Sequence, residues 1–381
     1  MGFSCGIVGL PNVGKSTLFN ALTQANVAAS NYPFCTIDPN VGIVPVPDPR
    51  LTQLSHLVPT EKVVSTTMRF VDIAGLVKGA SEGQGLGNQF LSHIAEVEAV
   101  AHVVRCFEDD QILHVSGTVD ARRDIEIINT ELALRDLGVV TATLARMEKP
   151  AKSGDKKAAA TVEVCRKLLT ALNQGNPARG VAAALGADEQ ERVKGLNLLT
   201  AKPVLYVANV SEAEMGKETP LLKAVREVAQ AEGAPVIPIC GAIEAQIAAL
   251  ESEQERAEFL AAVGLEEPGL HRLIRAGYER LGLITFFTVG PKEDRAWTVR
   301  KGARAPEAAG QIHSDMERGF IRAEVIGYSD FIECGSAAGA SGSATTRLGA
   351  EAAARERGKL RVEGKEYVVQ DGDLMHFRFS V

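Results

Sequence analysis

The chain has 381 residues and a formal net charge of −7, from 41 Lys and Arg against 48 Asp and Glu. Its 45% of hydrophobic residues is typical of a globular protein, and its length predicts two or three domains. The acidity excludes a protein that coats nucleic acid by charge alone. Six separated cysteines without a CxxC motif argue against zinc and iron–sulfur sites. With no apparent signal peptide or membrane span, we expect a cytoplasmic protein.

Strand and helix patterns alternate over about the first 120 residues and again after residue 202. Such alternation predicts right-handed crossovers and a mostly parallel sheet, which is an α/β fold. The segments with strand character are 3–10, 42–46, 68–72, 99–107, 203–209 and 235–240, and those with helical character are 15–25 and 220–232.

Residues 120–201 interrupt this alternation and show no strand character. Ile125, Ile128 and Leu132 recur at helical spacing, so we expect an inserted pair of antiparallel helices. Within the insertion, residues 146–167 contain seven basic and three acidic side chains, a net charge of +4. This stretch is either a solvated helix end or a surface that faces RNA.

Residues 283–381 form a third block, which we expect to be a small α+β domain. Its 14 basic and 14 acidic residues balance, so the negative charge of the chain belongs to the first 282 residues. One helical segment is expected at 306–319, and a Gly-, Ala- and Ser-rich stretch at 335–346 predicts a flexible surface loop. The expected strands are 286–289, 297–299, 366–369 and 374–379.

The strongest signal is a phosphate-binding motif, G-x4-G-K-[ST], at 9–16 between a predicted strand and a predicted helix. Its glycines let backbone N–H groups surround the phosphates, while Lys15 reaches the β- and γ-phosphates and Ser16 ligates Mg²⁺. The motif predicts one P-loop nucleotide-binding domain made from residues 1–119 and 202–282. The residues expected to contact the phosphates are Asn12, Val13, Gly14, Lys15, Ser16 and Thr17.

Two further segments have the positions of nucleotide-sensing switches. Asp72 ends a predicted strand and begins D-x-x-G, so we expect its carboxylate to hold Mg²⁺ and the Gly75 N–H to sense the γ-phosphate. Thr36, in the loop at 31–40, offers a second hydroxyl ligand to the metal. Five glycines between residues 75 and 88 indicate a loop that is mobile until the γ-phosphate orders it.

The expected base-binding strand ends in Asn209-Val210-Ser211-Glu212, where GTP-binding proteins carry N-K-x-D. Val210 replaces the Lys that stacks on the base, and Glu212 replaces the Asp that accepts the guanine N1–H and N2–H. We therefore expect Asn209, Val210 and Glu212 to bind adenine rather than guanine. The alternative is that this segment is only the exit of a strand.

These motifs resemble those of the YchF family, the Obg-like ATPases within the TRAFAC class of P-loop GTPases. The resemblance covers essentially the whole chain. It implies a preference for ATP, a need for Mg²⁺, a C-terminal β-grasp (TGS) domain at 283–381 and association with the ribosome, through the large subunit or the 70S particle. The segments that carry it are 9–22, 31–40, 72–80, 85–90, 104–108, 209–212 and 366–373.

The resemblance also bears on hydrolysis. Ras-like enzymes position the attacking water with a Gln after D-x-x-G, but Leu76 occupies that place here and cannot hydrogen-bond to water. A neutral imidazole accepts a hydrogen bond from water, so the seven histidines supply candidates. The resemblance points to His114, and His93 is the alternate.

We therefore expect a slow ATPase that signals its nucleotide state to the ribosome, and to RNA, through the helical insertion and the TGS domain. Two alternatives stay open, a GTPase and a binding module that nucleotide merely stabilises. No heptad pattern indicates a coiled-coil dimer, so we expect a monomer.

Overall fold

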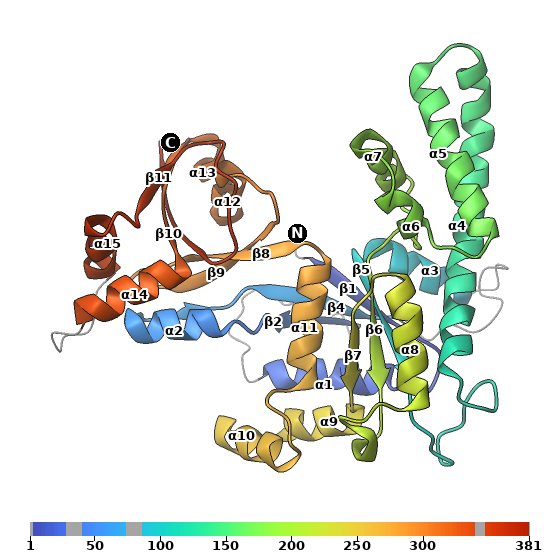
Figure 1. The fold of residues 1–381 in the computed structure, drawn as a ribbon, viewed down its shortest axis with the longest axis horizontal. Coiled ribbons are helices and arrows are strands. Elements are labelled where there is room, and N and C mark those ends of the chain that lie inside the picture. The colour runs from blue at the N-terminus through green and yellow to red at the C-terminus, as the bar shows by residue number, and fades with distance from the viewer. Residues whose placement is uncertain (1–2, 28–39, 74–85, 340–346, 381) are drawn as a thin grey trace. The chain divides into compact units, whose positions relative to one another are not determined.

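The chain of the computed structural model divides into two compact units (Figure 1). Unit 1 comprises Met1–Val44 and Arg69–Gly277, and unit 2 comprises Pro45–Met68 and Tyr278–Val381. This division differs from the expected domains in two ways. Residues 45–68 group with the C-terminal residues, and the helical insertion groups with the P-loop domain. The structure describes residues 3–27, 40–73, 86–339 and 347–380.

A mostly parallel sheet forms the centre of unit 1. Its strands are β1 (Ser4–Val8), β2 (Val41–Pro45), β4 (Thr67–Asp72), β5 (Ala99–Arg105), β6 (Val204–Asn209) and β7 (Val236–Ile239). They follow the order β2-β4-β1-β5-β6-β7, and the pairs from β4 to β7 are parallel. All residues of β1, β5 and β6 are buried, which explains their unbroken apolar runs in the sequence.

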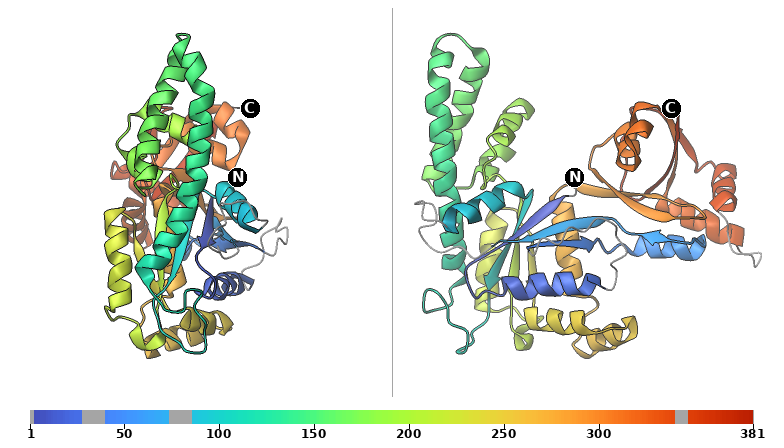
Figure 2. Two further views of the ribbon diagram at one scale, coloured as in Figure 1. Left: turned by 90° about the vertical axis from the view of Figure 1, so that its right-hand side faces the viewer. Right: turned by 180° about the vertical axis from the view of Figure 1, so that it is seen from behind.

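Helices cover both faces of this sheet (Figures 1 and 2). The helices α1 (Lys15–Val27) and α9 (Gly241–Ala249) pack together on one face, and α8 (Pro220–Ala231) packs on the other beside the inserted helices. The remaining helices of the unit are α3 (Leu86–Glu96), α10 (Glu253–Ala262) and α11 (Gly269–Arg280), which continues into unit 2. None of the helices in the described ranges is long and apolar enough to cross a membrane.

The insertion is the expected antiparallel pair, α4 (Ala121–Lys152) and α5 (Lys156–Asn173) (Figure 2). Ile125, Ile128 and Leu132 are buried as their spacing predicts. The chain reverses between the two helices at Gly154, whose φ of +93° suits glycine, and Asp155 caps the second helix. Two short helices follow, α6 (Ala178–Ala183) and α7 (Ala187–Gly195).

Unit 2 is built on a mixed sheet of order β11-β10-β12-β8-β9-β3. Its strands β12 (Asp373–Phe379) and β8 (Leu283–Thr288) pair in parallel, whereas β8 and β9 (Asp294–Arg300) pair antiparallel. The other strands are β3 (Val63–Val64), β10 (Phe320–Gly327) and β11 (Arg361–Glu363).

Two separate hydrophobic cores hold helices against the two faces of this sheet. Phe287 lies in the core that includes α2 (Pro49–Leu57), α14 (Tyr328–Gly339) and α15 (Arg347–Glu356). Its neighbour Phe286 points into the other core, with α12 (Ala305–Ile312) and α13 (Ser314–Arg318). Successive residues of a strand face opposite sides of a sheet, so these two phenylalanines anchor both layers.

Unit 2 is also where the sequence predictions were wrong in detail. The strand β10 was missed, and residues 366–369 form no strand but a single bridge between Val368 and Arg304. The expected helix at 306–319 is two helices, α12 and α13. Of the expected loop at 335–346, residues 335–339 are helical, and residues 340–346 lie outside the described residues. A Cβ on Gly335 would lie 2.5 Å from Leu57 Cδ2, so this glycine serves close packing.

Candidate nucleotide-binding site

The phosphate-binding motif forms the turn between β1 and α1 that the sequence predicts. Gly9 and Gly14 have φ angles of +156° and +99°, and the non-glycine Asn12 also has a positive φ of +63°. A Cβ on Gly14 would lie 2.3 Å from Asn209 Nδ2, and one on Gly9 would lie 2.4 Å from the Val103 carbonyl oxygen. The glycines are therefore required by both backbone conformation and space.

Lys15 lies at the N-terminus of α1 and is buried. Its ammonium donates a hydrogen bond to the Leu10 carbonyl at 2.8 Å. Burial lowers the pKa of Lys15 to about 8, although the charge of Asp72 acts in the opposite direction. A cation kept in the interior with so little compensation is suited to an anionic ligand such as a phosphate.

Ser16 and Asp72 come together from the start of α1 and the end of β4. The Ser16 hydroxyl donates to Asp72 Oδ2 at 3.4 Å. The other carboxylate oxygen, Oδ1, is buried and has no hydrogen-bond partner among the described residues. Burial raises the pKa of Asp72, against the opposing effects of Lys15 and Ser16. Two hard oxygen ligands with an unused lone pair fit Mg²⁺, which takes its other ligands from phosphates and water.

A cavity of about 560 Å³ extends from the P-loop to the ends of β5 and β6. The predicted residues Asn12, Gly14, Lys15, Ser16, Thr17, Asn209, Val210 and Glu212 all line it. Val13 is buried behind the P-loop instead. Sequence reasoning missed the lining residues Phe107, Glu108, Asp109, Ile112, Ser211, Cys240, Gly241 and Ala242.

Asn209 ties three parts of this cavity together. Its amide Nδ2 donates to the Val13 carbonyl at 2.9 Å, and its Oδ1 accepts the Gly241 N–H at 3.0 Å. The side chain thus joins the end of β6 to the P-loop and to the start of α9. Because both ends of its amide are engaged, Asn209 positions the cavity wall, whereas Val210 and Glu212 follow it along that wall.

The loop after β5 is held by Arg105, a buried residue that the sequence reasoning also missed. Its guanidinium donates to the carbonyl oxygens of Phe107, Asp109 and Ile112 at 3.1, 3.1 and 2.8 Å, and lies 4.7 Å from the centre of the Phe107 ring. All three of these loop residues line the cavity. Arg105 therefore shapes the wall of the cavity from behind.

The candidate residues for hydrolysis and switching lie elsewhere or outside the described part of the chain. His114 does not line the cavity; its Nε2 lies 2.8 Å from Asp124 Oδ2, and its side chain is 3% exposed. The alternate, His93, is exposed on α3 and lines a different, smaller hollow that also includes Asp72. Thr36, Gly75 and Leu76 lie outside the described residues, and of the expected loop at 75–88 the last three residues begin α3.

Comparisons with known proteins agree with this geometry. Residues 4–140 match a family described as 50S ribosome-binding GTPase, and residues 283–380 match the YchF GTPase C-terminal family, described as a protein of unknown function. The chain is 56% identical over its full length to a relative from Haemophilus ducreyi, and 54% identical to one from Bacillus subtilis. Both are named "Ribosome-binding ATPase YchF", and each is covered completely.

A solved structure supports the fold. The chain is similar to the structure titled "Structure of the Schizosaccharomyces pombe YchF GTPase", with 37% identity, a TM-score of 0.86, and coverage of 99% of this chain and 98% of that one. The likeness extends over both units, which confirms the α/β P-loop fold, the inserted helices and the additional C-terminal domain.

Proposed function

The chain belongs to the YchF family, and we propose that it is a slow, Mg²⁺-dependent ATPase that signals its nucleotide state to the ribosome. The observation that carries this proposal is the cavity itself. It joins a phosphate cradle around Lys15 to a base-binding wall that lacks the Lys and Asp of guanine-specific proteins. The names of the curated relatives, ribosome-binding ATPases, support both parts of the proposal.

The phosphates of ATP would lie against the N-terminus of α1, where the backbone N–H groups and the Lys15 ammonium neutralise their charge. Ser16 and Asp72 would hold Mg²⁺, which, when bound, stabilises the charge on the β- and γ-phosphates. Thr36 and Gly75 would complete this arrangement when triphosphate is bound. The unpaired Asp72 Oδ1 supports the assignment, because a buried carboxylate oxygen is costly unless a ligand uses it.

Val210 and Glu212 would favour adenine over guanine. The experiment is to titrate the protein with ATP and with GTP in the presence of Mg²⁺, and to repeat both titrations with Val210→Lys/Glu212→Asp. We expect ATP to bind more tightly to the wild type, and GTP to gain on the order of tenfold in the variant, since the restored Asp accepts both guanine N–H groups. A wild-type protein that prefers GTP contradicts the adenine proposal.

His114 would accept a hydrogen bond from the attacking water in place of the Gln of Ras-like enzymes. The position of Leu113 supports this proposal, because its carbonyl accepts a hydrogen bond from the P-loop residue Asn12 at 3.1 Å. The backbone next to His114 therefore lies against the P-loop. The competing function, a module that nucleotide only stabilises, predicts that His114→Ala leaves turnover unchanged.

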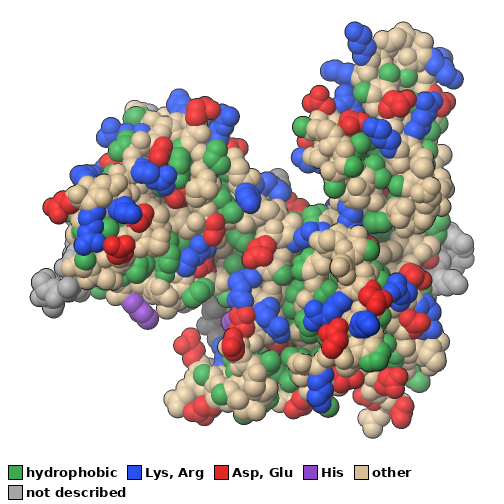
Figure 3. Space-filling model, in the orientation of Figure 1, with side chains coloured by type: hydrophobic (Ala, Val, Ile, Leu, Met, Phe, Trp, Pro, Cys, Tyr) green, Lys and Arg blue, Asp and Glu red, His purple; other side chains and the backbone are tan. Residues whose placement is uncertain are grey.

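The ribosome would bind the basic end of the helical pair, where α4 ends and α5 begins. Figure 3 shows Lys and Arg side chains gathered there. Lys149, Lys152, Lys156 and Lys157 are exposed there, and none has an ion-pair partner in the described part of the chain. We expect Lys152→Glu/Lys156→Glu to weaken co-sedimentation with ribosomes. The matched control is Lys217→Glu/Lys223→Glu, which reverses two exposed charges of unit 1 outside the helical pair. Equal co-sedimentation of the two variants contradicts the assignment.

With the ribosome as partner, the protein would act in the cytoplasm as a monomer. RNA contact through this basic end and through a TGS-type domain in unit 2 is part of the same proposal.

A further inference from the structure

The His114 side chain is buried and hydrogen-bonded to Asp124, a residue to which the proposed ATPase mechanism gives no role. The two side chains meet at 2.8 Å, and each is only 3% exposed. The seven residues that flank His114 on its loop, 111–113 and 115–118, are exposed. Among the loop residues from 108 to 118, His114 is thus the only one whose side chain is withdrawn from solvent.

The hydrogen bonds of His114 use both of its ring nitrogens. Nδ1 accepts the Ser116 N–H at 3.1 Å, so this nitrogen carries no proton. The ring proton is then on Nε2 and is donated to Asp124 Oδ2. In this position His114 has no free nitrogen with which to accept a hydrogen bond from water, so the ring cannot orient the attacking water.

Little would have to move to change that. The carbonyl of the neighbouring Leu113 accepts a hydrogen bond from the P-loop residue Asn12. Leu113 itself is 80% exposed, and Val115 on the other side of His114 is 53% exposed. Consecutive Cα atoms are about 3.8 Å apart, so the backbone of His114 is already beside the P-loop. A new rotamer of His114 redirects the ring without unpacking any buried apolar neighbour on the loop.

We propose that Asp124 is a latch that holds His114 away from the nucleotide, and that displacement of α4 opens it. The proposal rests on the proposed role of His114 in hydrolysis. Asp124 lies in the first turn of α4, a helix of 32 residues whose other end carries the basic residues. Movement of α4 withdraws the carboxylate and frees the Nε2–H. The ring can then turn, which breaks the hydrogen bond from the Ser116 N–H and leaves Nδ1 to accept a hydrogen bond from the attacking water.

Breaking the hydrogen bond between Asp124 and His114 should need little free energy. Asp124 Oδ1 is buried and has no hydrogen-bond partner in the described ranges, although Arg123 lies 3.6 Å away as an ion-pair partner. A carboxylate with one oxygen unsatisfied is held less firmly than one whose four lone-pair sites are used. The closed state is therefore only moderately favoured, which a switch between two states requires.

The test is steady-state ATP hydrolysis by full-length Asp124→Asn, with His114→Ala, the double variant and Asp120→Asn as comparisons. Asn is isosteric with Asp but forms a weaker, uncharged hydrogen bond, so we expect turnover to rise on the order of tenfold. Asp120→Asn removes the same charge four residues earlier and keeps the helix cap, so turnover should not change. If Asp124→Asn fails to fold, Asp124→Ser replaces it.

A second measurement follows the ring directly. Modification of His114 by diethyl pyrocarbonate, quantified on its peptide by mass spectrometry, should be several-fold faster in Asp124→Asn than in the wild type or in Asp120→Asn. Ribosomes should raise wild-type turnover by a larger factor than that of Asp124→Asn, and equal factors overturn the coupling to α4.

The outcomes separate the latch from the function on which it rests. Lower or unchanged turnover in Asp124→Asn, with His114→Ala impaired, overturns the latch, because Asp124 then only orients a working His114. Wild-type turnover in His114→Ala overturns the proposed function itself. The latch also requires that the double variant be as slow as His114→Ala alone.

Discussion

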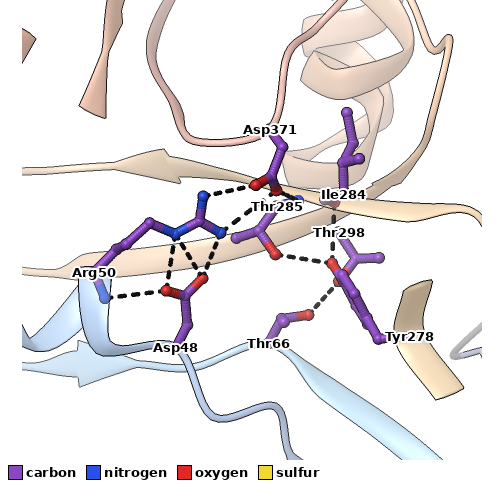
Figure 4. A network of polar contacts seen from close by, with 8 residues as sticks. All are labelled: Asp48, Arg50, Thr66, Tyr278, Ile284, Thr285, Thr298 and Asp371. Carbon is purple, nitrogen blue, oxygen red and sulfur yellow. Dashed lines mark hydrogen bonds and ion pairs between the residues drawn. The ribbon is translucent and has the colours of Figure 1, made fainter. Parts of the chain in front are cut away.

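The two units each contain a cation held among polar groups, and the two cations are held differently. In unit 2, Arg50 donates to Asp48 and Asp371, with its Nη atoms at 2.8 and 2.7 Å from their carboxylates (Figure 4). Its guanidinium also lies 5.2 Å from the centre of the Phe287 ring. Asp371 also accepts the Thr285 N–H at 2.9 Å. In unit 1, the Lys15 ammonium donates a hydrogen bond to one backbone carbonyl, and the only carboxylate among the described residues that acts on it is the more distant Asp72.

The pKa values record this difference. Burial would lower the pKa of Arg50, but the hydrogen bonds and charges of Asp48 and Asp371 outweigh it and raise that pKa. Burial prevails at Lys15, whose pKa falls to about 8. When a protein compensates a buried charge itself, removing that charge leaves its partners unpaired and destabilises the fold, whereas a charge left short of partners is available to a ligand. Arg50 is therefore structural and Lys15 functional, and three experiments can separate the two roles.

The largest effect is expected from Lys15→Ala. Without the ammonium, the charge that develops on the β- and γ-phosphates loses its main partner, and ATP turnover should fall roughly 10²–10³-fold. The nucleotide-free protein should melt at the same temperature as the wild type or higher, because a poorly compensated buried charge has been removed. Turnover assays and thermal melts measure the two effects. A melting temperature that falls with the activity would mean that Lys15 is structural after all.

Arg50→Ala should do the reverse. It leaves Asp48 with a side chain only 10% exposed and no guanidinium, while Asp371 is 51% exposed and regains water. We expect a loss of about 2 kcal/mol in the free energy of unfolding of unit 2, less than for a fully buried pair. Nucleotide affinity should be unchanged. The one tryptophan of the chain, Trp297, lies on β9 of unit 2 and reports its unfolding by fluorescence in urea.

The matched control for Arg50→Ala is Arg304→Ala. Arg304 pairs with Glu366 at 2.7 Å, but the two side chains are 57% and 80% exposed. An exposed pair contributes roughly 0–1 kcal/mol. If both variants shift the urea midpoint equally, the bonds of Arg50 to Asp48 and Asp371 add nothing beyond an ordinary surface ion pair.

The sequence predicted unit 1 much better than unit 2, for a physical reason. Strands buried on both faces, such as β5 and β6, give unbroken apolar runs that are visible without any tertiary information. The strand β10 mixes buried, partly buried and exposed residues and includes Arg322 and Glu324, so its sequence shows no such run. Val368 and Val369 favour a strand locally, but they lie where only one bridge forms.

The residues of the site also differ in how well the sequence alone predicts them. The P-loop is contiguous in sequence, and its residues could be assigned from their spacing. Asn209 contacts Val13 across 196 positions, and no local pattern indicates such a contact. Asp124 looks like an ordinary acid in the first turn of a helix, which is favourable for the helix dipole alone. Only the fold shows that it is buried against His114.

The smallest effect is expected from pH, and it sharpens the contrast between the two cations. With a pKa near 8, Lys15 of the free protein loses its proton as the pH rises from 7 to 9, whereas bound phosphates favour the charged form. Binding of ATP must then take up a proton, and affinity should fall about tenfold between pH 7 and pH 9. Calorimetric titrations at pH 9 in two buffers of different ionisation enthalpy measure that proton. Lys15→Arg keeps its charge over this range, so its weaker binding should show neither the proton uptake nor the same decline. A wild-type affinity that stays constant to pH 9 would mean that Lys15 is as well compensated as Arg50, and the comparison between the two units would fail.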